Sequence, residues 1–198
     1  MTKIEHSFIE AVAFQTAKEG KEYCGDSFYM TVYKDTFLCA LADGLGSGKA
    51  AFEASSSVVD YVKENVELDV ETLMQDCNRL LVDKRGAAVS LLKINLRQRE
   101  FIYSCVGNIR CYLYMPSGKT AFPLPVTGYL SGRPQNYRTQ TFTYEANSKF
   151  FIHSDGLKLT SSKSLMKSGL PLIAIAAEVE RSHMLKTDDS TFILGSLL

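Results

Sequence analysis

The stretch Phe37-Leu38-Cys39-Ala40-Leu41-Ala42-Asp43-Gly44-Leu45-Gly46-Ser47-Gly48 joins an apolar run to an acidic residue and a glycine-rich turn. A short, continuous apolar run bounded by a turn is typical of a buried strand. Glycine permits the backbone conformations of a tight turn, and so tight a turn leaves little room to hide a carboxylate. The residues from Ser47 to Asn65 then favour a helix. The stretch therefore predicts a buried strand that presents Asp43 just before a helix.

Acidic residues recur at the ends of other strand-like runs. Asp155-Gly156 follows an apolar run, Asp26 opens another, and the pair Asp188-Asp189 precedes a third. Each of these acids taken alone is also an ordinary turn residue, because a short carboxylate side chain hydrogen-bonds its own backbone. Their joint pattern along the whole chain indicates a metal site that the fold assembles.

Strands dominate the expected secondary structure. Runs rich in Val, Ile, Phe and Tyr predict strands at about residues 6–15, 27–33, 36–42, 87–96, 100–106, 109–115, 149–153 and 191–197. Helices are expected at about 47–65, at 70–83 and near 163–183. The second helix should bury one face, formed by Val70, Leu73, Met74, Cys77, Leu80 and Leu81. Blocks of strands with helices between the blocks favour an α+β fold.

Composition limits the class of protein. The 198 residues suit a single domain over 1–198, and the 45% hydrophobic content is enough for one core. Lys plus Arg and Asp plus Glu both total 22, so the chain lacks the basic field of a nucleic-acid-binding protein. Its five cysteines have no metal-binding spacing and are expected to be reduced. No apolar run approaches the ~20 residues that span a bilayer. We therefore expect a cytoplasmic protein with no nucleic-acid or membrane partner.

Carboxylates without clustered histidines indicate a hard divalent cation. Mg²⁺ and Mn²⁺ prefer oxygen ligands and keep several waters, whereas His6, His153 and His183 are scattered along the chain. Two such cations close together clamp the attacking and leaving oxygens of a phosphoryl group, and they make a shared water acidic enough to react at neutral pH. Hydrolysis of a phosphate ester is the reaction that this arrangement suits best.

The glycine-rich turn also imitates a nucleotide-binding loop. In such a loop, backbone amides hold phosphates and a Ser or Thr after the Lys binds Mg²⁺. Here only three residues separate Gly44 from Gly48, and Ala50 follows Lys49 where the hydroxyl should be. A nucleotide-binding regulator that uses Gly44 to Lys49 is an alternative function.

Six motifs can be read in order along nearly the whole chain. They are Gly25-Asp26-Ser27, Asp43-Gly44-Leu45-Gly46-Ser47-Gly48, Gly86-Ala87-Ala88, Val106-Gly107-Asn108-Ile109-Arg110, Ser154-Asp155-Gly156 and Asp188-Asp189-Ser190-Thr191. This order resembles the metal-dependent type 2C serine/threonine phosphatases, and in particular their compact bacterial branch. The resemblance implies a four-layer αββα sandwich, in which a central β-sandwich is flanked by helices and two Mn²⁺ or Mg²⁺ ions lie at one end.

By motif position, the resemblance assigns the metal ligands. Asp43 would bridge the two ions, and Gly44 would offer its backbone carbonyl. Asp26 would bind on one side of the pair, and Asp155 with Asp188 on the other. Catalysis is expected to depend above all on Asp43 and Asp155.

Two assignments rest on spacing within the family motifs. Asp188 is preferred to Asp189 because the family's ligand precedes the Thr by three positions, as Asp188 precedes Thr191. Lys21 holds the place of the Arg that binds the substrate phosphate, five residues before Asp26. A Lys neutralises phosphate but cannot grip it with two parallel hydrogen bonds.

The chain departs from the family pattern at three positions. Leu45 replaces the His that larger members carry after the Asp-Gly, so a protein acid for the leaving alcohol is missing there. Gly25 replaces an acid before the first metal Asp. Asn108 stands where many members have an Asp that helps to hold a third metal, so two ions are expected.

The loop-rich segment 116–147 is the candidate for a mobile recognition flap, because it contains several prolines and glycines. Tyr129, Arg133, Tyr137 and Arg138 are the residues within it that could contact a substrate, although an ordinary exposed loop residue is the more common role for each.

The resemblance implies a monomeric cytoplasmic enzyme that hydrolyses phosphoserine and phosphothreonine on stress-signalling proteins. Its partners would be phosphorylated stressosome scaffold proteins of the STAS type, and its action would be negative feedback on the general stress response. The rival within the same fold is a catalytically weak module that binds phosphoproteins without hydrolysis. Retention of all four acid sites favours the enzyme.

Overall fold

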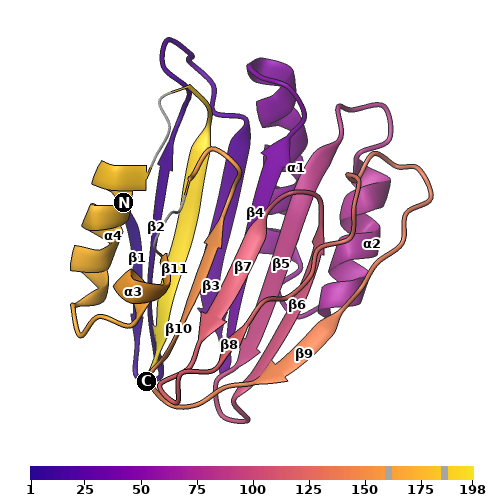
Figure 1. Ribbon diagram of the computed structural model, residues 1–198. Coiled ribbons are helices and arrows are strands. Elements are labelled where there is room, and N and C mark those ends of the chain that lie inside the picture. Colours follow the sequence, from indigo (N-terminus) through magenta and orange to yellow (C-terminus); the bar gives the residue numbers. More distant parts are fainter. Residues whose placement is uncertain (159–161, 184–186) are drawn as a thin grey trace.

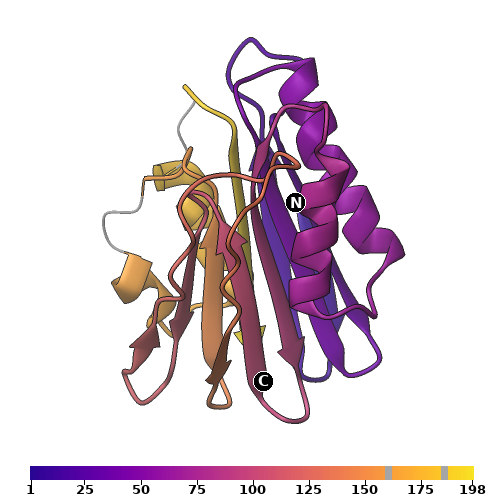
Figure 2. The ribbon, with the colours of Figure 1, turned by 90° about the vertical axis from the view of Figure 1, so that its right-hand side faces the viewer.

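The computed structural model describes residues 1–158, 162–183 and 187–198. Two antiparallel sheets pack face to face, and a pair of helices covers the outer side of each (Figure 1, Figure 2). In chain order the elements are β1 Thr2–His6, β2 Ile9–Thr16, β3 Asp26–Tyr33, β4 Thr36–Gly44, α1 Lys49–Glu64, α2 Val70–Leu80, β5 Ala87–Asn95, β6 Glu100–Val106, β7 Arg110–Tyr114, β8 Thr120–Ala121, β9 Gln140–Thr143, β10 Ser148–His153, α3 Ser162–Met166, α4 Leu172–His183 and β11 Ser190–Leu197.

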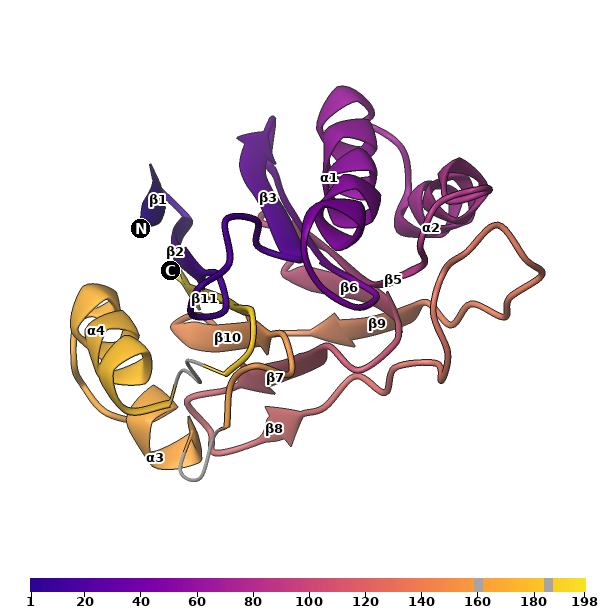
Figure 3. The ribbon, with the colours of Figure 1, turned by 90° about the horizontal axis from the view of Figure 1, so that it is seen from above.

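The layers follow from the order of the strands. One sheet has the order β1-β2-β11-β10-β7-β8, and the other has the order β3-β4-β5-β6-β9. One buried core lies between the sheets. A second lies between the five-stranded sheet and α1 with α2, and a third lies between the six-stranded sheet and α3 with α4. Seen from above, the helix pairs lie on opposite sides of the sandwich (Figure 3). The predicted αββα layering is confirmed.

Alternate residues of β4 face two different cores, which explains the unbroken apolar run. Phe37 and Leu41 lie in the core between the sheets, whereas Leu38 and Ala42 pack beneath α1 and α2. Successive side chains of a strand point to opposite faces, so a strand covered on both faces is apolar throughout. Both edges of β4 are also paired, with β3 and β5. The strand that leads to Asp43 is therefore held on four sides.

The second and third predicted helices need correction. Helix α2 ends at Leu80 rather than near residue 83, and Leu80 is 38% exposed while Asn78 is buried. The Asn78 side chain bonds the backbone of residues 131–133, so a polar contact replaces the expected apolar one. The expected helix near 163–183 is two helices, α3 and α4. Pro171 directly precedes α4, and the residue before a proline disfavours helical geometry.

Two further segments differ from the expected pattern. The run 6–15 is not one strand, because β1 and β2 form an antiparallel hairpin with His6 opposite Ile9. The segment 116–147 contains β8, which pairs with β7, and β9, which pairs with β6. Since β8 and β9 belong to different sheets, this connection crosses from one sheet to the other.

All five cysteines are free, with Cys24 partly buried and the other four buried. Among the described helices, none combines the length and apolar character that a membrane span requires.

Candidate metal centre

Two of the predicted ligands face each other across neighbouring strands. Asp26 is the first residue of β3 and pairs directly with Asp43 near the end of β4. Directly opposite residues in an antiparallel pair have side chains about 5 Å apart. Asp26 is 2% exposed, and Asp43 is partly buried. The pairing of β3 with β4 therefore brings two acids together at one end of the sandwich.

Ser154 joins this pair to the other sheet. Its hydroxyl donates a 2.7 Å hydrogen bond to the Asp26 carboxylate. Ser154 also exchanges bonds with Thr191, through its backbone amide to the Thr191 carbonyl and through its hydroxyl, which accepts from the Thr191 amide. The ends of β3, β10 and β11 thus meet at one buried serine. The sequence shows Ser154 only as a neighbour of Asp155, so its role in joining the sheets was missed.

The glycine after each Asp is required by close backbone contacts. A Cβ at Gly44 would lie 2.0 Å from the carbonyl oxygen of Ala51 at the start of α1. A Cβ at Gly156 would lie 1.9 Å from the carbonyl oxygen of Asp189. Any larger residue would push the turn away from its neighbour. Both Asp-Gly turns are therefore packed against the element that completes the site.

Asp155 and Asp188 are the other two acidic candidates. Asp155 is exposed, and Asn108 donates a 2.7 Å hydrogen bond from its side-chain amide to one Asp155 oxygen. The negative charge of Asp188, after the effect of burial, raises the pKa of Asp155, so the two carboxylates lie close to each other. This hydrogen bond from Asn108 orients the Asp155 carboxylate.

Asp188 and Asp189 have different roles in the structure. Both oxygens of Asp189 accept backbone hydrogen bonds, from the amide of Lys18 at 2.8 Å and from the amide of Gly25 at 2.8 Å. Asp189 is buried, whereas Asp188 is exposed. Asp189 therefore anchors both ends of the segment 18–25. This use of its carboxylate supports Asp188 as the candidate ligand, and that assignment stays a prediction.

Burial and neighbouring negative charges make the carboxylates of the centre hard to ionise. Burial raises the pKa of Asp43 to about 8, and the negative charges of Asp26, Asp155, Asp188 and Asp189 add to that rise. Burial also raises the pKa of Asp26 to about 6, although the Ser154 hydroxyl opposes the rise. A cation would relieve both effects, because it favours the charged carboxylates.

The residues present fit divalent cations with oxygen ligands. Asp26 Oδ1 is buried and has no hydrogen-bond partner within the described chain. In residues 1–158, 162–183 and 187–198 no group of three or more acidic, histidine or cysteine side chains lies close enough together to hold a metal ion by itself. An open arrangement of carboxylates suits Mg²⁺ or Mn²⁺, which keep waters and take few protein ligands.

The histidines take no part in the centre as far as the structure describes them. His153 is buried on β10, where its ring is stacked against Tyr112 and its Nδ1 lies 2.7 Å from the Ser154 carbonyl oxygen. His6 lies on β1 beside Phe8. The side chain of His183 lies outside the described residues.

The two lysines near the centre are both exposed. Lys21 lies in the segment that Asp189 anchors, and its backbone amide donates to the Lys18 carbonyl. The Lys49 side chain is 71% exposed at the start of α1 and lies 3.6 Å from Glu53. Lys49 thus pairs along its own helix, as expected of a solvated helix residue and unlike the Lys of a nucleotide-binding loop.

Comparison with known proteins agrees with this geometry. Residues 34–164 match the family model described as stage II sporulation protein E (SpoIIE). The chain is 46% identical over 193 residues to the phosphoserine phosphatase RsbX of Bacillus subtilis (strain 168), covering 98% of this chain and 97% of RsbX. The chain belongs to the type 2C phosphatase family. The family resemblance of the ordered motifs is thereby confirmed.

Solved structures place this type 2C phosphatase among its relatives. A crystal structure of RsbX in complex with magnesium superimposes with a TM-score of 0.95 at 45% identity and covers 100% of this chain and 99% of that one. The PP2C phosphatase domain of SpoIIE from Bacillus subtilis has a TM-score of 0.79 at 20% identity and covers 99% of this chain and 64% of that one. A structure from work on the bacterial stressosome has a TM-score of 0.86 at 24% identity and covers 94% and 98% of the two chains. The last two likenesses show the fold alone.

Proposed function

We propose that this type 2C phosphatase hydrolyses phosphoserine and phosphothreonine on phosphorylated stressosome scaffold proteins of the STAS type. It would act in the cytoplasm as a monomer, with one catalytic domain over residues 1–198, and its action would be negative feedback on the general stress response. The 46% sequence identity to the phosphoserine phosphatase RsbX, over almost the full length of both chains, supports the phosphoserine substrate. The observation that carries the chemistry is the pairing of Asp26 with Asp43 beside the Asp155 turn.

We propose that two Mn²⁺ or Mg²⁺ ions are held by Asp26, Asp43, the Gly44 carbonyl, Asp155 and Asp188. When bound, such ions lower the pKa of water and stabilise negative charge on the phosphoryl oxygens. Asp43 would be the ligand shared by the pair, because acids from both sheets are close enough to raise its pKa.

The remaining residues position these ligands. Ser154 holds one Asp26 oxygen, and the other oxygen is buried and has no hydrogen-bond partner among the described residues, so it could bind a cation. Asn108 holds one Asp155 oxygen in the same way. Outer-shell partners of this kind fix the orientation of a metal ligand before the metal binds. Lys21 would add positive charge for the substrate phosphate, since it is exposed on the segment that leads to Asp26.

The test is release of phosphate from a phosphoserine peptide with and without Mn²⁺. Chelation should abolish turnover, and added Mn²⁺ or Mg²⁺ should restore it. Full activity after exhaustive chelation would refute the metal mechanism. Tight phosphopeptide binding without any turnover in the presence of metal would favour the binding module of the same fold.

A further inference from the structure

A cavity of about 510 Å³ lies beside the Asp43-Gly44 turn. Leu45 lines one side of it, residues 82–86 after α2 form a second wall, and Tyr129 with residues 131–133 forms a third. The cavity thus begins one residue beyond the proposed metal ligand Gly44. It is a separate space, since none of the four acidic candidate ligands lines it.

Hydrogen bonds hold the three walls together. The Leu45 amide donates to the Gly86 carbonyl at 2.8 Å, and Ala87 and Leu130 exchange two backbone bonds of 2.9 Å. Asn78 on α2 accepts from the amides of residues 131 and 132 and donates to the carbonyl of Arg133. The connection between β8 and β9 and the start of β5 therefore lie side by side, which Figure 1 also shows. The cavity is built into the fold.

The lining of the cavity carries an excess of positive charge. Lys84, Arg85 and Arg133 are exposed cations, and Asp83 is the one acid among the lining residues. The chain as a whole has a formal net charge of +0. Of the residues that the structure describes, no acid forms a salt bridge with any of these three cations. A local cationic surface on a neutral protein indicates an anionic partner.

Arg85 contacts the loop that follows the Asp43-Gly44 turn. Its Nη1 lies 3.4 Å from the Leu45 carbonyl oxygen, and a Cβ on Gly46 would lie 2.4 Å from the same nitrogen. Gly46 has a φ of 90°, a conformation that favours glycine, so the turn leaves room for the guanidinium. The guanidinium is a planar fork with several donors that matches a carboxylate.

Apolar surface accompanies the charge. Leu45 is 37% exposed and Tyr129 is 46% exposed, and both line the cavity. A Cβ on Gly86 would lie 2.5 Å from the Tyr129 ring, so the ring packs directly over this glycine. The cavity can therefore make apolar contacts with an extended peptide as well as ion pairs with its acidic side chains.

We propose that this cavity binds the acidic peptide segment that flanks the phosphoserine of the substrate protein, and that Arg85 is the residue that selects it. The proposal rests on the phosphatase function proposed above. An extended chain advances about 3.3 Å per residue, and Arg85 contacts Leu45, one residue beyond Gly44. A side chain a few positions from the phosphoserine would therefore lie near Arg85 when the phosphate lies at the ions held by the carboxylates. Arg85 pairs with an acidic side chain of the peptide, and Arg133 adds charge at the opposite wall.

The test compares turnover of three substrates, one small phosphate ester and two phosphopeptides. The first is p-nitrophenyl phosphate, and the others are phosphoserine peptides that differ only in carrying Glu or Lys at the flanking positions. Arg85→Ala should lower kcat/KM about tenfold for the Glu peptide, chiefly through KM, because one charge-assisted hydrogen bond is lost. It should change p-nitrophenyl phosphate turnover less than twofold. Arg85→Glu should reverse the preference between the two peptides.

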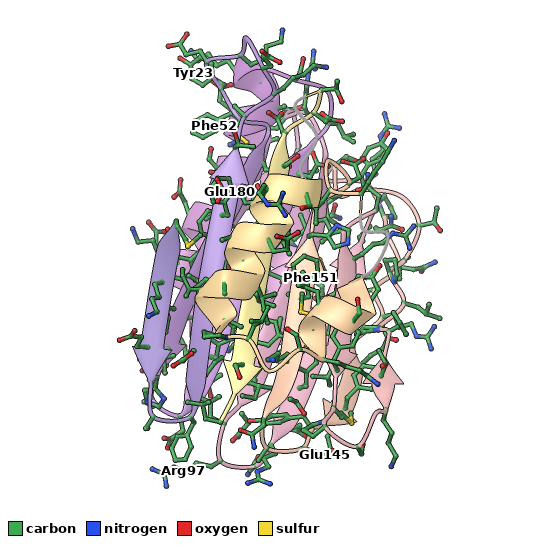
Figure 4. All side chains as sticks on the ribbon, turned by 60° about the vertical axis from the view of Figure 1, so that its left-hand side comes forward. Tyr23, Phe52, Arg97, Glu145, Phe151 and Glu180 are labelled. Carbon is green, nitrogen blue, oxygen red and sulfur yellow. The ribbon has the colours of Figure 1, made fainter. Side chains whose placement is uncertain are left out.

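Arg97→Ala is the matched control. Arg97 pairs with Asp35, and it lies at the far end of the molecule from Phe52, which is in the first turn of α1 and so marks the end that carries the Gly44 turn (Figure 4). Arg133→Ala is an independent variant on another wall of the cavity. It should also lower kcat/KM selectively for the Glu peptide, but by a smaller factor. Equal losses on the peptide and on p-nitrophenyl phosphate would overturn the proposal, since Arg85 would then act on the phosphate or on the fold. Unchanged kcat/KM for the Glu peptide in both variants would also overturn it. A wild-type protein inactive on all three substrates would refute the phosphatase function itself.

Discussion

The Asp-Gly pair at the end of β4 and the Asp-Gly turn after β10 belong to opposite sheets and hold their acids differently. Asp43 is partly buried, and a second acid, Asp26, lies directly opposite on β3. Asp155 is exposed, and the amide of Asn108 holds it. The same local sequence thus gives a charge-crowded acid in one sheet and a hydrogen-bonded acid in the other. What differs is the residue that each neighbouring strand or turn supplies.

The largest expected effect is a difference in kcat/KM between variants of Asp43 and of Asp155. Asp43→Asn keeps the size of the side chain but removes the charge proposed to bridge both ions, so kcat/KM on a phosphoserine peptide should fall by about three orders of magnitude or more. Asp155→Asn should lose less, because it contacts one ion in this scheme. Circular dichroism should show that both variants fold. Wild-type turnover by Asp43→Asn would remove this residue from the site, and its unfolding would indicate a purely structural turn.

A second difference should appear in the stability of the metal-free protein. Asp43 has a pKa raised to about 8 in the folded state, against about 3.9 in an unfolded chain. Between these values the unfolded chain loses the proton while the folded protein keeps it, so the free energy of unfolding falls as pH rises from about 4 to about 8. One pKa unit is about 1.4 kcal/mol, and 1 kcal/mol shifts Tm by about 2–4 °C at this chain length.

The Tm of the metal-free wild type should therefore drop by more than about 5 °C over this range relative to Asp43→Asn, which lacks the titrating group. Asp155→Asn should keep most of this drop, because burial is the main cause of the raised Asp43 pKa and Asp155 is one of four neighbouring charges that add to it. Thermal unfolding in chelator at several pH values measures both. Parallel Tm curves for the wild type and Asp43→Asn would contradict the charge crowding assigned to Asp43.

Removing the hydrogen bond from Asn108 to Asp155 tests whether the Asp155 turn needs a partner to bind the cation. Asn108→Ala deletes the donor that holds the Asp155 carboxylate, so the affinity for the divalent cation should fall about tenfold or more, as for other outer-shell partners. Stability without metal should hardly change, because Asn108 is exposed. Activity as a function of Mn²⁺ concentration gives the affinity, and saturating Mn²⁺ should restore most of the rate. An unchanged Mn²⁺ dependence would mean that Asp155 needs no positioning.

The smallest effect concerns a positive charge outside both turns. Lys21→Ala should raise KM several-fold and lower kcat less, because a contact equally strong in the ground and transition states contributes uniform binding. Lys21→Arg should preserve or improve binding. Lys49→Ala is the matched control, since Lys49 is exposed on α1 and pairs with Glu53. Unchanged kcat and KM in Lys21→Ala would leave recognition of the phosphate to the metal ions.

Much of the framework could be predicted from patterns in the sequence. The apolar run 37–42 and its Asp-Gly end follow from period and turn chemistry, which act between neighbouring residues. The strands at 100–106 and 36–42 and the start of α2 were expected at nearly their observed bounds. Local rules failed where a distant group intervened. The predicted apolar position Leu80 is exposed because α2 ends there, and the polar Asn78 is buried because residues 131–133 satisfy its amide.

The sequence by itself determined which residues could serve as ligands. These are acids at strand ends next to small residues, since the histidines are scattered and lack the spacing of metal ligands. Only the tertiary structure decided how these acids are used. Asp26 meets Asp43 through the β3–β4 register, Ser154 links Asp26 to the second sheet, and Asp189 is occupied by backbone amides of the segment 18–25. The cationic cavity at Arg85 likewise joins three segments that are far apart in the sequence, at Leu45, at 82–86 and at 129–133. Hydrogen bonds and charge interactions depend on distance in space, which the order of residues along the chain does not contain.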